Sequence, residues 1–277
     1  MFSVREGESM RIVDCHVHVG KLDDPSNLLR LMDANGVQRL LILSECERIS
    51  ARKTLENLKT LEKFAQADRS RLSCLAWINP TIAGAAGLAE RALTDMGYSG
   101  IKIIPDHWYA YEPHLEPFWE KMDGLKASIL FHTGILYGFE DGSRFCHPEN
   151  LEKLMAYPNI RFAMAHVSWP WCEECLAVMG RMKAAVGYVK TGWQSYIDLT
   201  PGTPPHIRKQ AIANAVSFCG GVDHIMWGSD SSTGANLAYQ KEVIDGDLAI
   251  FKDLGLDAAQ QERIFSGTAD EVFPAKP

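Results

Sequence analysis

Two histidines, His16 and His18, lie in the short segment RIVDCHVHV of residues 11–19. The segment is apolar and rich in β-branched residues, which favours a buried strand. Side chains at positions i and i+2 leave a strand on the same face, so we expect both imidazoles to point the same way. Two imidazoles placed in this way can bind one metal ion at bond lengths of about 2.0–2.1 Å. The alternative is two unrelated histidines on a half-buried strand, because a three-residue pattern also arises by chance.

Three later segments end in the same kind of residue. Short apolar runs lead to His132, His166 and Asp230. In a parallel α/β barrel the carboxyl ends of the strands gather on one face, and that face carries the chemistry. Residues placed by chance would be scattered through loops and helices instead. The sequence therefore predicts one metal site at the strand ends of a (β/α)8 TIM barrel.

Strand-like and helix-like segments alternate along the chain, as a parallel sheet with outer helices requires. The expected strands are residues 11–19, 38–45, 71–79, 100–105, 128–132, 160–166, 195–200 and 224–230. For the seventh strand, residues 186–191 are the alternative, but 195–200 alternate better and end at PGTPP. The expected helices are residues 25–35, 50–67, 83–96, 114–126, 148–157, 204–219, 236–254 and 258–266. We see no repeat or linker, so we expect one domain over residues 1–277, a length close to the ~250 residues of such barrels.

The composition agrees with a globular domain that has a large core and lies in a reducing cytosol. Hydrophobic residues make up 46% of the chain, and no apolar run approaches the ~18 residues of a membrane span. The first ten residues hold no apolar region, so we expect no secretory signal. The net charge of −7 argues against a nucleic-acid partner, and the odd number of cysteines favours free thiols in a reducing compartment. We expect a small-molecule substrate, no nucleic-acid or membrane partner, and leave assembly into a homo-oligomer open.

The chain resembles the metal-dependent amidohydrolase superfamily, in particular its amidohydrolase-2 branch. The resemblance rests on VDCHVH, GIKIIP, FHTG, AHVSWP, WGSD and IFSGTADEVF, in this order over nearly the whole chain. It implies that His16 and His18 are metal ligands from the first strand and that His132 is the ligand from the fifth. It also implies that His166 is the histidine of the sixth strand and Asp230 the aspartate of the eighth.

Three imidazoles and one carboxylate suit Zn²⁺, and such a set would also accept Mn²⁺, Fe²⁺ or Co²⁺. A bound divalent ion can lower the pKa of water to about 7. We expect Asp230 to be both a ligand and the acceptor of that proton; the alternative is a helix N-cap. His166 is the second catalytic candidate, which would donate to a substrate carbonyl or bind a second ion. The alternative for His166 is a structural histidine bonded to a backbone carbonyl.

Lys102 lies in the middle of the expected strand GIKIIP. A buried lysine is unusual unless its amine has a partner. We favour a partner in the substrate or a carboxylate; a metal-bridging carbamate and a structural ion pair are the alternatives.

Aromatic side chains gather in the segments after the expected strands, where they can form the wall of a small-molecule site. The substrate-binding candidates are Trp108, Tyr137, Trp169 and Trp171, with Tyr109, Tyr111 and Trp193 nearby. Arg144 is a candidate for binding a substrate carboxylate, because guanidinium pairs with such groups through two hydrogen bonds. The alternative is that these loops pack on one another. The pair Cys172 and Cys175 is interpreted as packing cysteines, since a second CxxC is missing.

The leading functional interpretation is a metal-dependent hydrolase of a small cyclic ester or amide, with lactones ahead of amides. The first alternative is a metal-dependent non-oxidative decarboxylase of a small aromatic or unsaturated acid, which would use the same residues. The second is a non-catalytic metal-binding barrel, although structural zinc sites are usually closed by four ligands.

Overall fold

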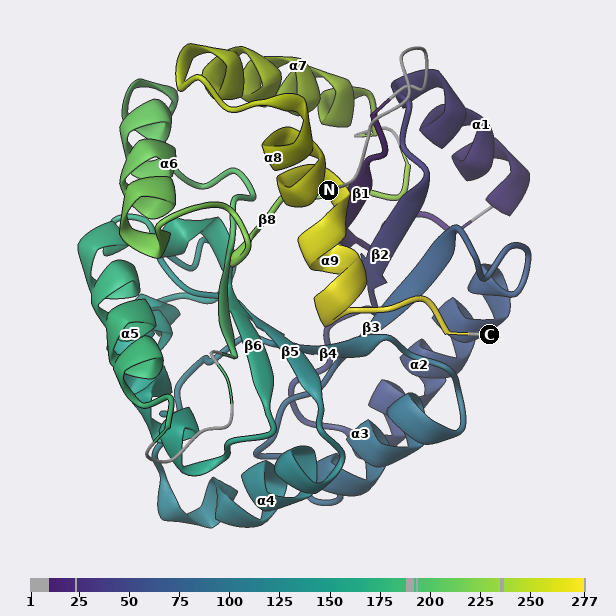
Figure 1. The fold of residues 1–277 in the computed structure, drawn as a ribbon. Coiled ribbons are helices and arrows are strands. Elements are labelled where there is room, and N and C mark those ends of the chain that lie inside the picture. Colours follow the sequence, from purple (N-terminus) through teal and green to yellow (C-terminus); the bar gives the residue numbers. More distant parts are fainter. Residues whose placement is uncertain (1–9, 23, 188–191, 193, 235–236, 277) are drawn as a thin grey trace.

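The computed structural model describes residues 10–22, 24–187, 192, 194–234 and 237–276 (Figure 1). Its strands all run parallel in one sheet, and successive strands are neighbours from β1 to β8. They are β1 Val13–His18, β2 Arg39–Leu43, β3 Leu72–Trp77, β4 Gly100–Ile103, β5 Ser128–Phe131, β6 Arg161–Met164, β7 Ser195–Asp198, β8 Ile225–Met226 and β9 Ser231–Ser232. The preferred seventh strand is thus confirmed, and residues 188–191 of its alternative lie outside the described residues.

The eighth strand position closes the sheet into a barrel. β8 pairs with β7, while β9, which follows shortly after β8, pairs with β1. Between them, Cys15 N donates to Trp227 O at 3.2 Å and Asp230 N donates to His16 O at 3.0 Å. The expectation of one continuous strand over 224–230 is therefore wrong. The chain leaves the regular strand after Met226, and Asp230 takes a left-handed backbone with φ 57°.

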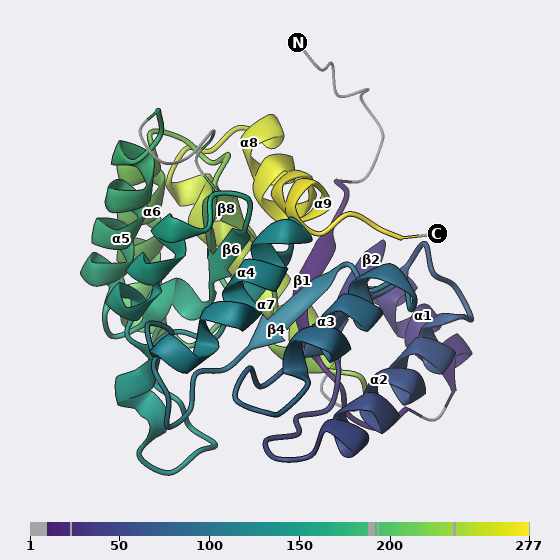
Figure 2. The same cartoon turned by 90° about the horizontal axis from the view of Figure 1, so that it is seen from below.

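Helices cover the outside of this barrel in Figures 1 and 2. They are α1 Pro25–Asn35, α2 Ala51–Ala65, α3 Ala85–Thr94, α4 Glu116–Gly124, α5 Cys172–Ala184, α6 Pro205–Cys219 and α7 Leu237–Asp253. Two short helices, α8 Ala258–Glu262 and α9 Thr268–Val272, lie over one end of the barrel instead (Figure 1). The position after β5 is taken by a 3-10 helix, η3 Pro148–Ala156, where we expected an α-helix over 148–157. Pro148 and Pro158 delimit this short connection, and 3-10 turns are typical of such connectors. Among the helices that the structure describes, none is long and apolar enough to cross a membrane.

Local sequence signals set where these helices start. α1 begins at Pro25, and the Asp24 side chain accepts a hydrogen bond from Ser26 N; α1 ends at Gly36, whose φ is 73°. α2 begins after Ser50, whose hydroxyl accepts from Lys53 N. The buried side chains of α2 recur every three or four residues, as expected for a helix with one face on the sheet. They are Thr54, Leu58, Leu61 and Ala65.

The barrel interior has its own core and is closed at one end. Strand side chains that point inward form one cluster with Ala269, Val272 and Phe273 from the end of the chain. Phe273 fits so tightly against Gly100, the first residue of β4, that a Cβ at Gly100 would lie 2.7 Å from its ring. Arg39, the first residue of β2, donates to Phe273 O at 2.9 Å. α9 therefore covers the amino-terminal ends of the strands, which leaves the carboxyl ends for a functional site (Figure 1).

Candidate metal centre

An irregularity in β1 positions the first histidine. The register of β1 with β2 shifts between Asp14 and Val17, as in a β-bulge. Cys15 belongs to the cluster inside the barrel, and the next side chain, His16, also meets inward-facing residues of β4 and β7. A regular strand does not point two consecutive side chains to one face, whereas a bulge does. The His16 and His18 rings lie 5.3 Å apart.

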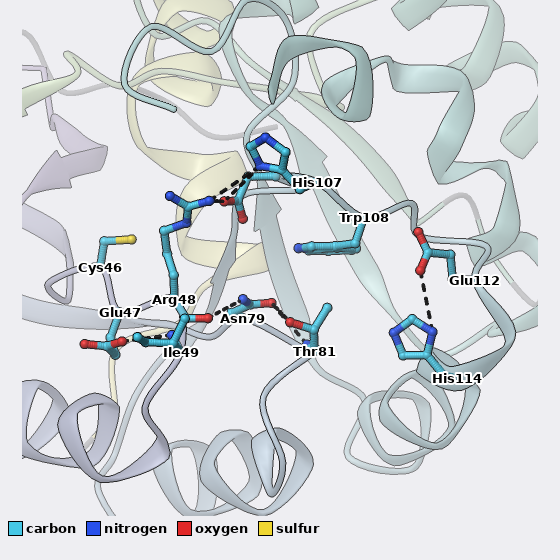
Figure 3. A pocket seen from close by; sticks show the side chains of 11 residues that line it. Cys46, Glu47, Arg48, Ile49, Asn79, Thr81, His107, Trp108, Glu112 and His114 are labelled. Atoms are coloured by element: carbon cyan, nitrogen blue, oxygen red, sulfur yellow. Dashed lines mark hydrogen bonds and ion pairs between the residues drawn. The ribbon is translucent and has the colours of Figure 1, made fainter. Parts of the chain in front are cut away.

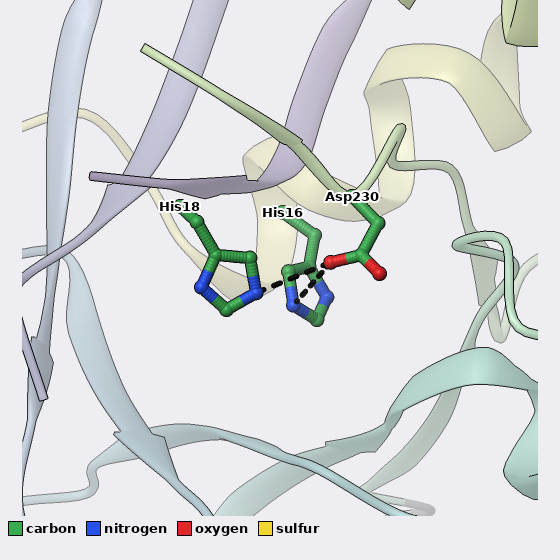
Figure 4. A group of neighbouring side chains, drawn as sticks. All are labelled: His16, His18 and Asp230. Atoms are coloured by element: carbon green, nitrogen blue, oxygen red, sulfur yellow. Dashed lines mark ion pairs between the residues drawn. The ribbon is translucent and has the colours of Figure 1, made fainter. Parts of the chain in front are cut away.

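Asp230 completes a three-residue cluster with these histidines. Its Oδ1 lies 3.5 Å from His16 Nε2 and 3.1 Å from His18 Nε2 (Figure 4). The turn that carries Asp230 is held by buried Asp14, which accepts hydrogen bonds from the N–H and the hydroxyl of Ser229. The unusual backbone of Asp230 is thus fixed from both sides, by its own bond to His16 O and by the bonds of Ser229 to Asp14.

Asp198 determines which nitrogen of His16 faces the cluster. Asp198 Oδ2 lies 2.8 Å from His16 Nδ1, and both side chains are buried. Thr200 donates to the same carboxylate through its N–H and its hydroxyl, both at 2.8 Å. A carboxylate that accepts these bonds places the proton of His16 on Nδ1 and leaves the lone pair on Nε2. Carboxylate–histidine pairs of this kind orient metal ligands in proteins.

Two further histidines extend the cluster into an arc of four imidazoles. The His166 ring lies 5.3 Å from that of His16 and 4.9 Å from that of His132. His166 Nδ1 donates to Pro201 O at 2.8 Å, and His132 Nε2 donates to Ile135 O at 3.1 Å. Because a carbonyl only accepts, the nitrogen without a proton is Nε2 in neutral His166 and Nδ1 in neutral His132.

The electrostatics of the centre favour neutral forms of His16, His132 and His166 beside an ionised Asp230. Burial, assisted by the charge of Lys102, lowers the pKa of His16 well below its usual range. Burial likewise lowers the pKa of His132 well below its usual range and that of His166 to a lesser degree. Burial alone would raise the pKa of Asp230, but the hydrogen bond from His18 and the nearby imidazoles bring it below the ordinary value. Neutral imidazole and carboxylate are the forms that bind metal ions.

The residues present fit a divalent ion. The nearest donor atoms of His16, His18 and Asp230 all lie within 4.8 Å of one another. Tetrahedral bonds of about 2.0–2.1 Å place ligand atoms about 3.3 Å apart, close to the 3.1 and 3.5 Å from Asp230 Oδ1 to the two histidines. These three residues would hold the ion, and His132 Nδ1 or His166 Nε2 could supply a further nitrogen.

Lys102 is fully buried on β4, and its Nζ lies 3.3 Å from His16 Nε2. Burial lowers the pKa of Lys102 to about 8, against the opposing charges of Asp198 and Asp230. Burial raises the pKa of Asp198 to about 7, while the hydrogen bonds of Thr200 and the charge of Lys102 act the other way. The lone pair of His16 that faces Lys102 is the one a metal ion would use, so the amine and the ion compete for it.

A family model described as Amidohydrolase matches residues 13–275. The chain belongs to the amidohydrolase family. It is therefore an enzyme of the metal-dependent type that includes hydrolases and decarboxylases. No curated protein sequence matches the chain.

Solved structures of other amidohydrolase-like proteins share the fold at low sequence identity. The 5-carboxyvanillate decarboxylase from Sphingomonas paucimobilis has a TM-score of 0.72 at 14% identity, over 97% of this chain and 100% of that one. A probable 2-pyrone-4,6-dicarboxylic acid hydrolase from Acinetobacter baumannii, with citric acid bound, has a TM-score of 0.66 at 14% identity, over 95% and 98%. An amidohydrolase from Burkholderia multivorans with bound zinc has a TM-score of 0.66 at 15% identity, over 96% and 99%. These likenesses confirm the barrel fold of this amidohydrolase.

Two of the predicted substrate-binding residues line cavities, but different ones. Trp108 is 3% exposed and lines a cavity of about 790 Å³ with Arg48 and Asn79, to which none of the three-residue cluster contributes (Figure 3). Its indole nitrogen has no hydrogen-bond partner in the described part of the chain. Tyr137 is 80% exposed and lines a second cavity, of about 540 Å³.

The other predicted binding residues have partners of their own. Arg144 is exposed, pairs with Asp141 and lies over the ring of Phe145. Trp171 packs against His147, with ring centres 3.6 Å apart and the rings tilted by 34°. Trp169 is half-buried, and its carbonyl accepts from Ile135 N, while Trp193 lies outside the described residues. Substrate binding stays a prediction for Arg144, Trp169 and Trp171. Cys172 and Cys175 are both free, and burial raises the pKa of both thiols.

Sequence reasoning missed the polar residues that orient the cluster. Asp198 and Thr200 lie at the end of the strand expected over residues 195–200. A carboxylate at the end of a strand was the signal that could have identified Asp198. Asp14 stands within the VDCHVH motif, where an aspartate in an apolar strand also indicates a buried partner. None of the three was recognised as part of the site.

Proposed function

We propose that this amidohydrolase opens a small cyclic ester or amide, preferentially a lactone, with the help of one divalent ion. His16, His18 and Asp230 would hold the ion, with His132 as the fourth ligand. Zn²⁺ suits this donor set, and Mn²⁺, Fe²⁺ or Co²⁺ are the alternatives. When bound, such an ion lowers the pKa of water and polarises a carbonyl group.

The position of Asp230 carries this proposal. Its Oδ1 faces both histidines, whereas its other oxygen is directed away from them, and the side chain is 31% exposed (Figure 4). Asp230 can therefore accept the proton of an attacking water at the open side of the cluster. When the C–O bond of the ring breaks, the leaving alkoxide needs a proton, which Asp230 can return.

We assign His166 to proton transfer in place of donation to the carbonyl oxygen. Its Nδ1–H donates a hydrogen bond to Pro201 O, and its pKa is lowered by burial. Neutral His166 thus offers a lone pair on Nε2 and no second proton. Lys102, buried beside His16, and Tyr137, at the exposed cavity, remain our candidates for binding the substrate, together with Trp108. All seven cysteines are free, which supports the cytoplasm as the proposed location.

The test combines metal content with a substrate panel. We expect about one ion per chain in protein purified without chelator, with acid released from lactones. His16→Ala should lose both the ion and the activity, whereas His206→Ala, at an exposed histidine of α6, should keep both. Release of CO₂ from hydroxy-aromatic acids without lactone opening would favour the alternative decarboxylase. Two tightly held ions per chain would contradict a single-metal centre and point to a carbamate on Lys102.

A further inference from the structure

Three of the arginines in the segments that follow β2, β5 and β7 are each paired with an aspartate. The pairs are Arg48 with Asp106, Arg144 with Asp141, and Arg208 with Asp247. Arg208 and Asp247 are both buried, and two hydrogen bonds of 2.7 and 2.6 Å join them. A guanidinium already matched by a carboxylate has little net charge left for a second one. These arginines therefore attract a substrate carboxylate only weakly.

The cavity of about 540 Å³ lies between the loop after β7, the helix α7 and Tyr137. Most of its walls are apolar or aromatic. They include Pro201, Pro204, Pro205, Tyr239, Val243 and Ile250. Glu242 is the one charged residue on these walls for which the described part of the chain shows no partner. A negatively charged group in this cavity would thus meet a like charge.

The loop after β7 connects this cavity to the metal centre. Pro201 lines the cavity, and its carbonyl accepts the hydrogen bond of His166 Nδ1. Gly202 also lines it, and a Cβ there would lie 2.9 Å from His166 Cβ. The cavity therefore adjoins His166, through two residues of this loop.

The donors on the walls suit an uncharged oxygen better than a carboxylate. α6 begins at Pro205, which has no N–H, and the N–H groups of Ile207 and Arg208 both donate to Pro204 O. The N–H groups at the amino-terminal end of α6 are therefore largely engaged in hydrogen bonds within the chain. Nη1 of Arg208 is buried without a partner among the described residues, but Asp247 neutralises its guanidinium. A carbonyl or hydroxyl oxygen satisfies such a donor without adding a second negative charge.

We propose that this cavity holds the non-reacting part of the substrate, and that this part is a ring or side group without a carboxylate. The proposal rests on the function proposed above, because it concerns the substrate of the same centre. The substrate class is then a neutral lactone with an apolar or aromatic substituent that bears at most hydroxyl or carbonyl oxygens. It differs from 5-carboxyvanillate and 2-pyrone-4,6-dicarboxylic acid, the carboxylated molecules named for two of the solved neighbours.

Two δ-lactones with similarly sized substituents test how a negative charge on the substituent affects turnover. One carries a phenyl group on the ring, and the other carries a 4-carboxyphenyl group at the same carbon. We expect kcat/KM for the phenyl lactone to be about tenfold higher or more, since like charges that face each other disfavour binding. Glu242→Arg should bring the ratio toward one. Glu120→Arg, the same change at an exposed position of α4, should leave the ratio as it is.

Filling or opening the cavity tests its location. Val243→Trp should lower kcat/KM for the phenyl lactone more than for the unsubstituted lactone. Because Val243 is buried and a tryptophan there risks unfolding, Tyr239→Ala at a 41% exposed position is the second variant, and it should raise KM for the phenyl lactone alone. Titration calorimetry with a phenyl lactam that the protein is first shown not to open measures binding to the same metal-loaded proteins without turnover.

The two readouts separate this proposal from the proposed function. Lactone opening with equal or better use of the carboxyphenyl lactone overturns the proposal and leaves the hydrolase in place. Binding of the lactam that weakens in the Val243 and Tyr239 variants, without opening of any lactone, supports the cavity and overturns the hydrolase. Lactam binding that is absent, or unchanged in both cavity variants, overturns the proposal.

Discussion

Asp198→Asn tests whether the buried carboxylate of β7 positions His16 for metal binding. Asp198 receives three hydrogen bonds, one from His16 Nδ1 and two from Thr200, all at 2.8 Å. An asparagine has one acceptor oxygen and one NH₂ group, so a donor must face a donor on one side of the amide. The amide also lacks the charge that holds the His16 proton on Nδ1. Loss of such a partner lowers metal affinity about 10–100-fold, which corresponds to about 1.4–2.7 kcal/mol of binding free energy.

The assay is the dissociation constant of the metal ion, measured by competition with a chromophoric chelator at neutral pH. Asp245→Asn, at an exposed aspartate of α7, is the matched control and should bind as the unchanged protein does. Circular dichroism shows whether each variant is folded. A folded Asp198→Asn protein with unchanged affinity would refute the positioning role. If His16→Ala also kept its affinity, the ligand assignment itself would be wrong.

Four further variants address turnover, ligation and stability. Asp230→Asn cannot accept a proton, so lactone turnover should fall about 10²–10⁴-fold with a smaller loss of metal; full activity would remove Asp230 from the mechanism. His132→Asn should lower the metal content in elemental analysis, whereas His166→Asn should keep the metal and lose about 10²–10⁴ in turnover; equal metal loss would make both histidines ligands. Phe273→Ala empties the closed end of the barrel and should cost about 3–5 kcal/mol in denaturant unfolding, and a loss below about 1 kcal/mol would mean that α9 contributes little packing.

The barrel could be predicted because its signal is local. Each strand is a short apolar run, and β2 and β3 are buried over their whole length, as strands covered on both faces must be. The carboxyl ends of such strands meet on one face whatever the details of packing. This rule brings the segments that carry His16, Asp230 and His166 to the same face, although they are far apart in the sequence.

The eighth strand shows where a local signal fails. Residues 224–227 are apolar apart from His224, and the pattern alone continues the strand toward Asp230. In the fold, Gly228 packs so close to β1 that a Cβ would lie 2.9 Å from His16 Cβ. The chain must turn there, and the turn is what directs Asp230 toward the histidines. The cause is a contact between the first and last strands of the barrel, which no window of sequence contains.

The role of each histidine depends on the oxygen atom to which its ring donates a hydrogen bond, more than on where the histidine stands in the sequence. His132 and His166 look alike in sequence, since each ends an apolar run. Ile135 O occupies Nε2 of the first, and Pro201 O occupies Nδ1 of the second. The ring nitrogen without a proton is consequently Nδ1 in the first histidine and Nε2 in the second. Both oxygens are backbone carbonyls, so the residue type at either position does not predict the bond. A backbone carbonyl has no sequence signature, so the tautomer of each imidazole, and with it the choice between ligand and proton acceptor, follows only from the folded chain.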